Sequence, residues 1–354
     1  MRFNIKALIK LGIEFPYFLC LVKHLGKKNR CKYSYIFGTP VHENMGDHLI
    51  TYAEKEYLKD IKFQTSNLIE IPIEAYMLFA DRLQSCIQSD ETIFINGGGW
   101  MGNIWPNDEK LIDDMITRFK NNRIIIFPQT IYYDKSEPDY DKILRESIAA
   151  LSSNENLTLC LRDENSLVFA QEKYLNVKSM LIPDITLSLY DNISQKEENR
   201  LKRVGLCLRS DREKSSDIHL INQWIEYYRA QDYSFKNVST TVKVRVPAFC
   251  RKKALMKLLA EYQKCSVVIT DRLHGMIFAY LTGTPCVVFD NLTRKISGVY
   301  SKWLKDAEGI YLISDNPENV WMKKESIVSN SKKGSKEIFF DFSELERAII
   351  DGQD

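Results

Sequence analysis

Short apolar runs recur along the whole chain, and longer amphipathic stretches separate them. In the first half these runs cover residues 33–37, 92–95, 123–127, 157–161 and 179–182. Runs that are apolar on both faces and alternate with helix-length segments are typical of a parallel sheet covered by helices. The first half is therefore predicted to form a Rossmann-like α/β domain.

The second half repeats this pattern. Its apolar runs cover residues 204–208, 242–246, 266–270, 285–289 and 310–313. The polar, charged stretch 190–202 between the halves is predicted to be a linker. We expect two Rossmann-like domains, residues 31–190 and 203–320, that face one another across a cleft. Residues 1–30 form a separate basic segment, and a tail of residues 321–354 is expected to pack back on the N-terminal domain.

Length and charge agree with two soluble domains. The chain has 354 residues, more than one hydrophobic core comfortably organises. Of these residues 44% are hydrophobic and 27% are charged. The net charge of +2 gives no argument for a nucleic-acid partner. The eight cysteines are scattered without C-x-x-C spacing, so we expect buried thiols in a reducing compartment, with neither a disulfide framework nor a metal site.

The N-terminal segment concentrates positive charge. Its first 32 residues carry eight Lys or Arg against the single Glu14, and its longest apolar run, 15–22, is too short to span a bilayer. Lys6 and Lys10 interrupt the apolarity that a signal peptide needs. We expect a cytoplasmic protein. The segment suits either an amphipathic helix on the inner face of the cell membrane or a helix packed on the protein.

In open α/β sheets, ligands bind beyond the carboxyl ends of the strands, so functional side chains are expected in the loops that follow strands. In the loop 38–47, Asn44 or Asp47 could cap the following helix. Alternatively, Asp47 could bind or deprotonate a sugar hydroxyl. His42 in the same loop is expected to line the cleft.

The loop 96–102 formally matches G-x-G-x-x-G. The segment that follows it, Asn-Ile-Trp-Pro, does not continue as the helix of a dinucleotide fingerprint, so nicotinamide binding is not expected. Gly98 and Gly99 would instead allow close backbone approach to an anionic or sugar ligand. Trp100 and Trp105 could stack on a pyranose or simply pack in the core.

Two arginines, Arg162 and Arg209, follow predicted strands. The planar guanidinium group matches carboxylate and phosphate, so arginines facing the cleft favour a small anionic substrate. Pairing with a neighbouring Asp163 or Asp211 is the alternative for each.

The segment 271–275, Asp-Arg-Leu-His-Gly, is the most informative because it lies where a buried strand becomes a helix. The free N–H groups of a helix N-terminus bind anions, and Arg272 strengthens such a site. His274 could act as a general acid or a phosphate ligand, and Gly275 permits close backbone approach. Asn291 and Lys295 are further candidates for the cleft wall.

These motifs together resemble the polysaccharide pyruvyl transferase family. The likeness extends from about Tyr33 to Trp303. It rests on seven short segments, namely residues 44–47, 97–99, 127–129, 161–163, 183–184 and above all 271–275 with 283–285.

The resemblance implies a GT-B-like fold and a transfer from phosphoenolpyruvate to a sugar, typically galactose or N-acetylmannosamine, with no cofactor or metal. The family's Arg-Leu-His segment, which binds the donor and supplies the acid, corresponds to Arg272, Leu273 and His274. A further donor arginine is either Arg162 or Arg209. The acceptor side is expected at Asn44, Gly46, Gly98, Gly99, Trp100 and Gln129, with Asp47 as the base.

The implied product is a cyclic ketal on a sugar of a surface polysaccharide or capsule precursor, carried by a membrane lipid. Two other functions stay open, since fold does not fix chemistry. One is a GT-B glycosyltransferase with a nucleotide-sugar donor. The other is a non-catalytic component of a glycan-assembly complex.

Overall fold

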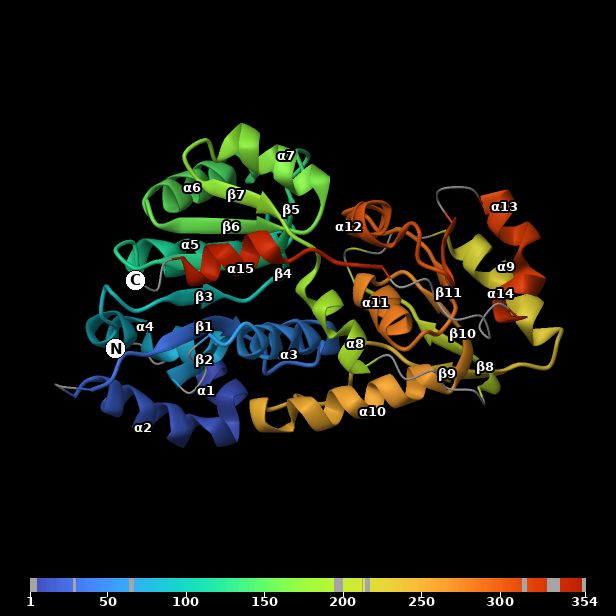
Figure 1. Ribbon diagram of the computed structural model, residues 1–354, viewed down its shortest axis with the longest axis horizontal. Helices are drawn as coiled ribbons and strands as arrows, with labels where there is room; N and C mark the ends of the chain where they lie inside the picture. Colours follow the sequence, from blue (N-terminus) through green and yellow to red (C-terminus); the bar gives the residue numbers. More distant parts are fainter. Residues whose placement is uncertain are drawn as a thin grey trace.

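A computed structural model describes residues 5–27, 30–63, 67–193, 200–211, 213, 217–313, 317–329 and 338–351. It contains two open, all-parallel sheets side by side, with helices covering their faces (Figure 1). The first sheet has the order β2-β1-β3-β5-β6-β7, and β4 pairs with β5. Its strands are β1 (Ser34–Thr39), β2 (Leu68–Pro72), β3 (Ile93–Ile95), β4 (Gly98–Gly102), β5 (Ile124–Tyr132), β6 (Leu157–Leu161) and β7 (Lys178–Leu181).

The second sheet has the order β12-β11-β10-β8-β9. Its strands are β8 (Leu201–Cys207), β9 (Ser234–Asn237), β10 (Cys265–Thr270), β11 (Cys286–Val288) and β12 (Ile310–Leu312). Parallel sheets with out-of-sequence strand order and helical crossovers are doubly wound Rossmann-like sheets. The predicted fold class, two Rossmann-like domains facing across a cleft, is therefore confirmed.

Helices complete both domains. The first carries α3 (Met45–Asp60), α4 (Ile73–Cys86), α5 (Pro106–Arg118), α6 (Tyr140–Ser152), α7 (Glu164–Lys173), η3 (Ile185–Leu189) and α8 (Tyr190–Ile193). The second carries α9 (Ile218–Arg229), η4 (Ala248–Cys250), α10 (Arg251–Gln263), α11 (Leu273–Leu281), α12 (Lys295–Val299), η5 (Tyr300–Leu304), α13 (Pro317–Met322) and α14 (Lys324–Ser329). The predicted linker 190–202 begins as α8 and ends in β8, and its middle, 194–199, lies outside the described residues.

One predicted strand, residues 242–246, is wrong. These residues are not in a strand because their backbone crosses to the first domain, where the Val242 amide donates to the Glu43 carbonyl at 2.9 Å. Just before them, the Met45 amide donates to the Thr240 carbonyl at 2.6 Å. The edge strand of the second sheet is instead the polar segment Ser234–Asn237. The segment 240–246 therefore joins the domains rather than extending a sheet.

The two domains share a hydrophobic core. One continuous cluster of buried side chains includes Leu49 and Phe94 from the first domain together with Met276 and Phe278 from the second. Within it, helix α3 packs against η3 and α10, and η3 contacts α11. The wall between the sheets is thus apolar and close-packed on one side of the cleft.

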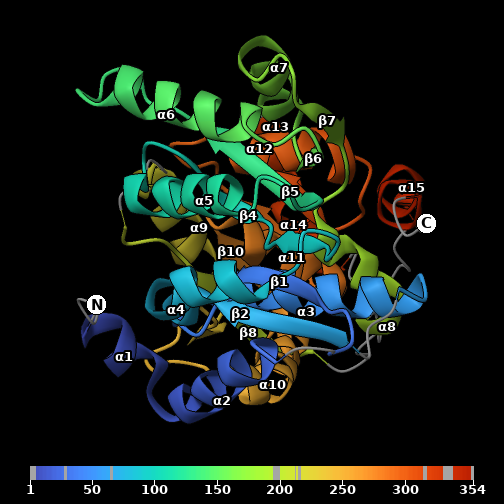
Figure 2. The same cartoon turned by 90° about the vertical axis from the view of Figure 1, so that its left-hand side faces the viewer.

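The first and the last described helices pack on the first domain. Helices α1 (Ile5–Leu11) and α2 (Phe15–Leu25), joined by η1 (Gly12–Glu14), lie against α4. The buried pair of Arg30 with Glu91 anchors the segment that follows them. Helix α15 (Ser343–Ile350) lies on the first domain at the other end, where the Arg123 guanidinium donates to the Ile349 carbonyl at 3.0 Å (Figures 1 and 2).

Within the described ranges, no helix is long and apolar enough to cross a bilayer. The eight thiols are free; Cys86, Cys160, Cys207, Cys265 and Cys286 are buried, whereas Cys20, Cys31 and Cys250 are exposed.

Candidate functional site

A pocket of about 480 Å³ lies between the two domains. Strand ends, helix starts and loops of both domains supply its walls, as the doubly wound topology predicts. From the first domain it is lined by Gly38, His42, Glu43, Asn44, Asp47, Ile73, Asn96, Gly97, Gly99, Trp100, Trp105, Asp108 and Arg162. From the second it is lined by Arg209, Asp211, Glu213, Thr240, Thr241, Arg272, Leu273, His274 and Lys295.

The start of α11 forms one wall of this pocket. Strand β10 ends at Thr270, whose hydroxyl donates to the Cys207 carbonyl at 2.7 Å and accepts the Arg272 amide at 3.0 Å. This tight turn makes Arg272 the N-cap of α11, so the first-turn amides lie beside the pocket. The Arg272 Nε is buried without a hydrogen-bond partner among the described residues. The start of α11 thus offers free amides and one unpartnered guanidinium Nε at the place where the anion site was predicted.

His274 lies in the first turn of α11 and lines the pocket with 11% of its side chain exposed. Its Nε2 is 3.9 Å from the buried Asp184 carboxylate and has no hydrogen-bond partner within the described part of the chain. Burial lowers the pKa of His274 to about 4, although Asp184 pulls in the opposite direction. The imidazole is uncharged at neutral pH, and a dianion bound beside it would raise its pKa.

Gly46 in the first domain makes room for His274 in the second. A methyl group on Gly46 would lie 2.5 Å from the His274 Nδ1, closer than any real contact. Gly46 itself is absent from the pocket lining among the described residues, so it acts on the pocket through His274.

Replacing Gly46 by alanine should therefore displace the imidazole and lower turnover roughly 10- to 100-fold, since small misplacements of reacting groups have effects of this size. Steady-state rates would be measured for Gly46→Ala, His274→Ala and the double variant. If Gly46 acts through His274, adding Gly46→Ala to His274→Ala costs little more. Additive losses would contradict this account.

Arg162 is almost fully buried at the end of β6. Its Nη1 donates to Asp184 at 2.7 Å and its Nε to the Thr130 hydroxyl at 2.9 Å. Burial would raise the pKa of Asp184, but the charge of Arg162 holds that pKa below its usual value. The neighbouring Asp163 is not its partner, because the Asp163 carboxylate accepts the Ser166 amide and caps α7.

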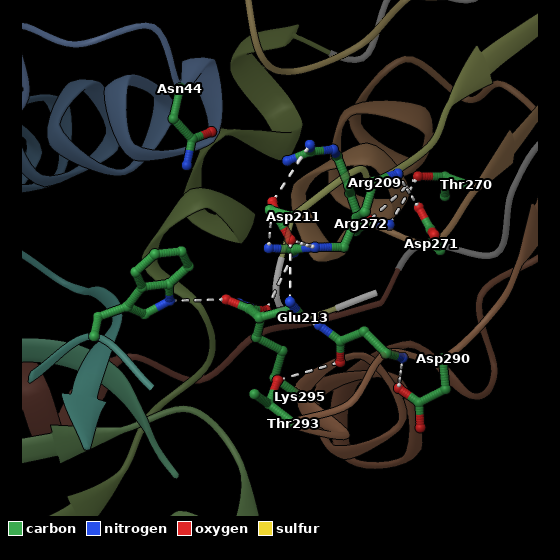
Figure 3. A network of polar contacts seen from close by, with 12 residues as sticks. Asn44, Arg209, Asp211, Glu213, Thr270, Asp271, Arg272, Asp290, Thr293 and Lys295 are labelled. Atoms are coloured by element: carbon green, nitrogen blue, oxygen red, sulfur yellow. Dashed lines mark hydrogen bonds and ion pairs between the residues drawn. The ribbon is translucent and has the colours of Figure 1, made fainter. Parts of the chain in front are cut away.

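The second domain contributes a dense charge network (Figure 3). Arg209 pairs with Asp211 at 2.8 Å and with Glu213 at 3.2 Å, and Lys295 pairs with Glu213 at 2.6 Å. Asp211 also lies 3.7 Å from the Arg272 guanidinium. Pairing of Arg209 with Asp211, one of the two alternatives from the sequence, is thus observed.

Each of these cations is paired with a carboxylate, so the pocket lining carries both positive and negative charge. Burial lowers the pKa of Lys295, and Glu213 opposes that shift. The Trp105 indole also donates to Glu213, at 3.2 Å, which ties the first domain to this network. Sequence reasoning missed Asp184 and Glu213 as partners because nothing in the spacing of the chain brings them to these cations.

Asn44, not Asp47, caps α3: its side chain accepts the Gly46 amide at 3.0 Å. The Asp47 carboxylate instead faces the pocket, where it accepts a hydrogen bond from the Asn44 side chain at 2.7 Å. The His42 Nε2 lies 3.5 Å from the same carboxylate. The residues of this loop therefore form a polar cluster on the side of the pocket that the first domain supplies.

The glycine segment is not a loop, as the sequence suggested, but the short strand β4, which pairs with β5 from Gly98 to Gly102. Trp100 and Trp105 both line the pocket. The Trp100 indole donates to the Asn96 carbonyl at 3.1 Å and packs over Gly38, where a β-carbon would collide with the ring.

Three further candidates are not among the described residues that line the pocket. Gln129 is buried, and its amide donates to the Asn96 carbonyl at 2.9 Å. Gly98 gives the backbone a φ of +142° beside Trp100. Gly275 leaves space for the Thr270 hydroxyl and the Cys207 thiol, so it allows α11 to pack against its sheet. All three shape the wall from behind.

Sequence reasoning also missed Glu54, a fully buried carboxyl on α3 that accepts the Gly97 amide at 2.7 Å. Burial raises its pKa to about 8 from the ordinary 4.5. Between these two values the folded protein holds a proton that the unfolded chain has lost, so stability falls as pH rises, by roughly 1.4 kcal/mol per pH unit.

Glu54→Gln removes this dependence. The free energy of unfolding of Glu54→Gln minus that of wild type should increase steadily from pH 5 to pH 8, as measured by urea denaturation. Glu56→Gln on the same helix is the control and should show a constant difference. Parallel curves for Glu54→Gln and wild type would mean that Glu54 is ionised in the folded protein.

In the part of the chain that the structure describes, no group of three or more His, Cys, Asp or Glu side chains is arranged to hold a metal ion.

Comparison with known proteins shows the family of the chain. The sequence profile of the family described as Polysaccharide pyruvyl transferase matches residues 44–293, which is more than half of the chain. This chain belongs to the polysaccharide pyruvyl transferase family. Membership identifies it as a transferase and connects it with polysaccharide biosynthesis.

Two relatives are similar to this chain along most of their length. Pyruvyl transferase 1 of Schizosaccharomyces pombe is 26% identical over 298 residues, which are 79% of this chain and 72% of the relative. General stress protein 30 of Bacillus subtilis is 31% identical over 285 residues, 80% of this chain and 81% of the relative. An uncharacterized protein from Klebsiella pneumoniae has a solved structure with a TM-score of 0.51 at 17% identity, covering 82% of this chain and 94% of that one, so it shares the fold.

Proposed function

We propose that this protein transfers the pyruvyl unit of phosphoenolpyruvate onto two hydroxyls of one sugar, forming a cyclic ketal and releasing phosphate. The observation that carries the proposal is that Arg272 and His274 line the same pocket as Asp47, from opposite domains. Family membership supports the reaction type. The acceptor is a galactose or related hexose of a lipid-linked precursor, and no cofactor or metal is needed.

The donor binds at the start of α11. The Arg272 Nε has no hydrogen-bond partner among the described residues, so it is available to the donor, and the first-turn amides add partial positive charge. Of the two further arginines, Arg209 suits the donor better, because it shares Asp211 with Arg272. Arg162 is committed to Asp184. Lys295 supplies another cation to the same wall.

The proposed reaction begins with proton transfer to the donor. His274, protonated once the donor dianion lies beside it, gives a proton to the methylene carbon, and C2 becomes electrophilic. A first sugar hydroxyl, deprotonated by Asp47, adds to C2. Phosphate leaves with the electron pair of its C2–O bond and takes up the proton held by Asp47. The second hydroxyl then adds to C2, closes the ketal and gives its proton to the His274 imidazole, so both groups return to their starting states. Each acid–base group typically contributes about 10²- to 10⁴-fold.

The sugar binds on the wall of the first domain. Asp47, Asn44 and His42 offer hydrogen-bonding groups there, and Trp100 and Trp105 offer ring faces. Gly99 lets the backbone come close to the ligand. Because phosphoenolpyruvate is a cytoplasmic metabolite in this scheme, the protein acts in the cytoplasm.

A donor screen tests the proposal. Phosphate release would be measured with phosphoenolpyruvate, with and without a panel of galactosides, and ketal products would be identified by mass spectrometry. Release that requires a galactoside supports pyruvyl transfer. Binding of a nucleotide sugar, without any use of phosphoenolpyruvate, would instead support a glycosyltransferase.

A further inference from the structure

Five large apolar side chains are exposed where the N-terminal helices meet the loop before α10. Ile9 and Ile13 are each 73% exposed, Phe249 is 70%, Val244 is 69% and Tyr17 is 59%. Isolated exposed apolar residues are ordinary, but a contiguous group marks an interaction surface. We call these five residues, with the lysines around them, the docking face.

Two contacts hold the parts of the docking face together. The Arg245 guanidinium donates to the Lys10 carbonyl and pairs with Glu74 at 3.0 Å. The Ala248 amide donates to the carboxylate of Glu14 at 2.9 Å. Val244 and Phe249 are the chain neighbours of these two anchors. The loop is therefore fixed beside α1 and η1, although it belongs to the other domain.

The N-terminal helices are apolar on two sides. One side is used by the protein, since Leu11, Phe18 and Val22 are buried in the core cluster of the first domain. The other side presents Ile9, Ile13 and Tyr17 to solvent. Of the two readings left open by the sequence, packing on the protein is thus observed, and it leaves the outward stripe without a use inside the fold.

The charge around this stripe is positive. Lysines with exposed side chains lie on α1, α2, the loop before α10 and the first turn of α10, namely Lys6, Lys10, Lys23, Lys243, Lys252 and Lys253. Of the acidic side chains nearby, Glu14, Glu70 and Glu74 are largely buried, and arginines pair with the last two. Glu43 is partly exposed and lies beside Arg245. Figures 1 and 2 both place α2 and α10 along the same edge of the molecule.

Exposed apolar groups beside exposed lysines favour binding to an anionic bilayer, because the apolar groups insert and the lysines contact lipid phosphates. A second copy of the chain would bring lysines against lysines. The face also adjoins the pocket, because Arg245 lies 3.7 Å from the carboxylate of Glu43, which lines it.

We propose that the docking face binds the surface of an anionic membrane and holds the pocket opening beside it. A substrate sugar carried on a membrane lipid would then reach the pocket without leaving the bilayer. The membrane contact does not depend on the proposed donor chemistry, and it can be tested separately.

The test uses the full chain and sedimentation with vesicles of phosphatidylcholine, alone or with 30–40% phosphatidylglycerol, roughly the charge of an anionic leaflet. We expect binding to the mixed vesicles that weakens strongly at high salt. The double variant Ile13→Ser/Phe249→Ser should bind at least about 10-fold more weakly, because it removes two large inserting side chains. Leu175→Ser/Phe339→Ser is the matched control, since both residues are exposed elsewhere, and it should bind like wild type.

Equal binding by the docking-face variant and wild type, or no binding of wild type to anionic vesicles, would overturn the proposal. Concentration-dependent dimerisation that the docking-face variant abolishes, without vesicle binding, would show a contact between copies instead. Phosphate release with a soluble galactoside serves as a separate readout. It should be the same in wild type and in the docking-face variant, so its absence in both would refute the transfer reaction and not the membrane contact.

Discussion

Phosphate release from phosphoenolpyruvate is expected to fall at least about 100-fold when His274 is replaced by alanine, the lower limit for loss of a general acid. The imidazole lies at the start of α11, inside the interdomain pocket. The negative charge of the bound donor would raise its pKa, so that it can carry the proton. Alanine leaves space but no proton donor. The rate would be measured at saturating donor and acceptor, together with the thermal unfolding midpoint.

The control for this prediction is His219→Ala, which removes an exposed histidine on α9 that is not among the described residues lining the pocket. It should leave the rate unchanged. A wild-type rate in His274→Ala would exclude His274 as the acid. A loss of rate accompanied by a large drop in the unfolding midpoint would assign the residue to stability instead.

Arg162→Met is expected to lower the free energy of unfolding by about 3–5 kcal/mol, because it leaves the Asp184 carboxylate buried and unpaired. Both side chains of this pair are only 1% exposed. Chemical denaturation would measure the loss. Adding Asp184→Asn should recover part of it, since the uncompensated charge is then gone.

Arg229→Met provides the comparison. Arg229 and Glu226 form an exposed ion pair on α9, and such pairs contribute about 0–1 kcal/mol. If Arg162→Met costs no more than Arg229→Met, Asp184 is protonated or rehydrated in the variant and the pair does not stabilise the fold.

The fold could be predicted where burial dictates the sequence. Strands such as β6 and β10 are buried along their length, so continuous apolar runs marked them. Strand β9 reads Ser-Phe-Lys-Asn at a sheet edge and carries no such signal. Residues 242–246 show the reverse error: their valines suggested a strand, yet the backbone serves the contact between domains.

The site could be predicted where a functional group follows a strand directly. Arg272, His274 and Asp47 were found in this way, and the fold brings all three to one pocket. The ion-pair partners of the cations could not be found, because Glu213 and Lys295 lie 82 positions apart in the chain and only tertiary structure brings them together. For the same reason the sequence could not show that Gly46 makes space for an imidazole of the other domain.

The apolar cluster that runs through both domains also limits how the enzyme exchanges its ligands. Separating the domains would break the packing of α3 on α10 and of η3 on α11 and expose apolar side chains of this cluster, which costs free energy in proportion to the area exposed. We therefore expect substrates to exchange without wide separation of the domains, and we expect the two halves to unfold in one cooperative transition.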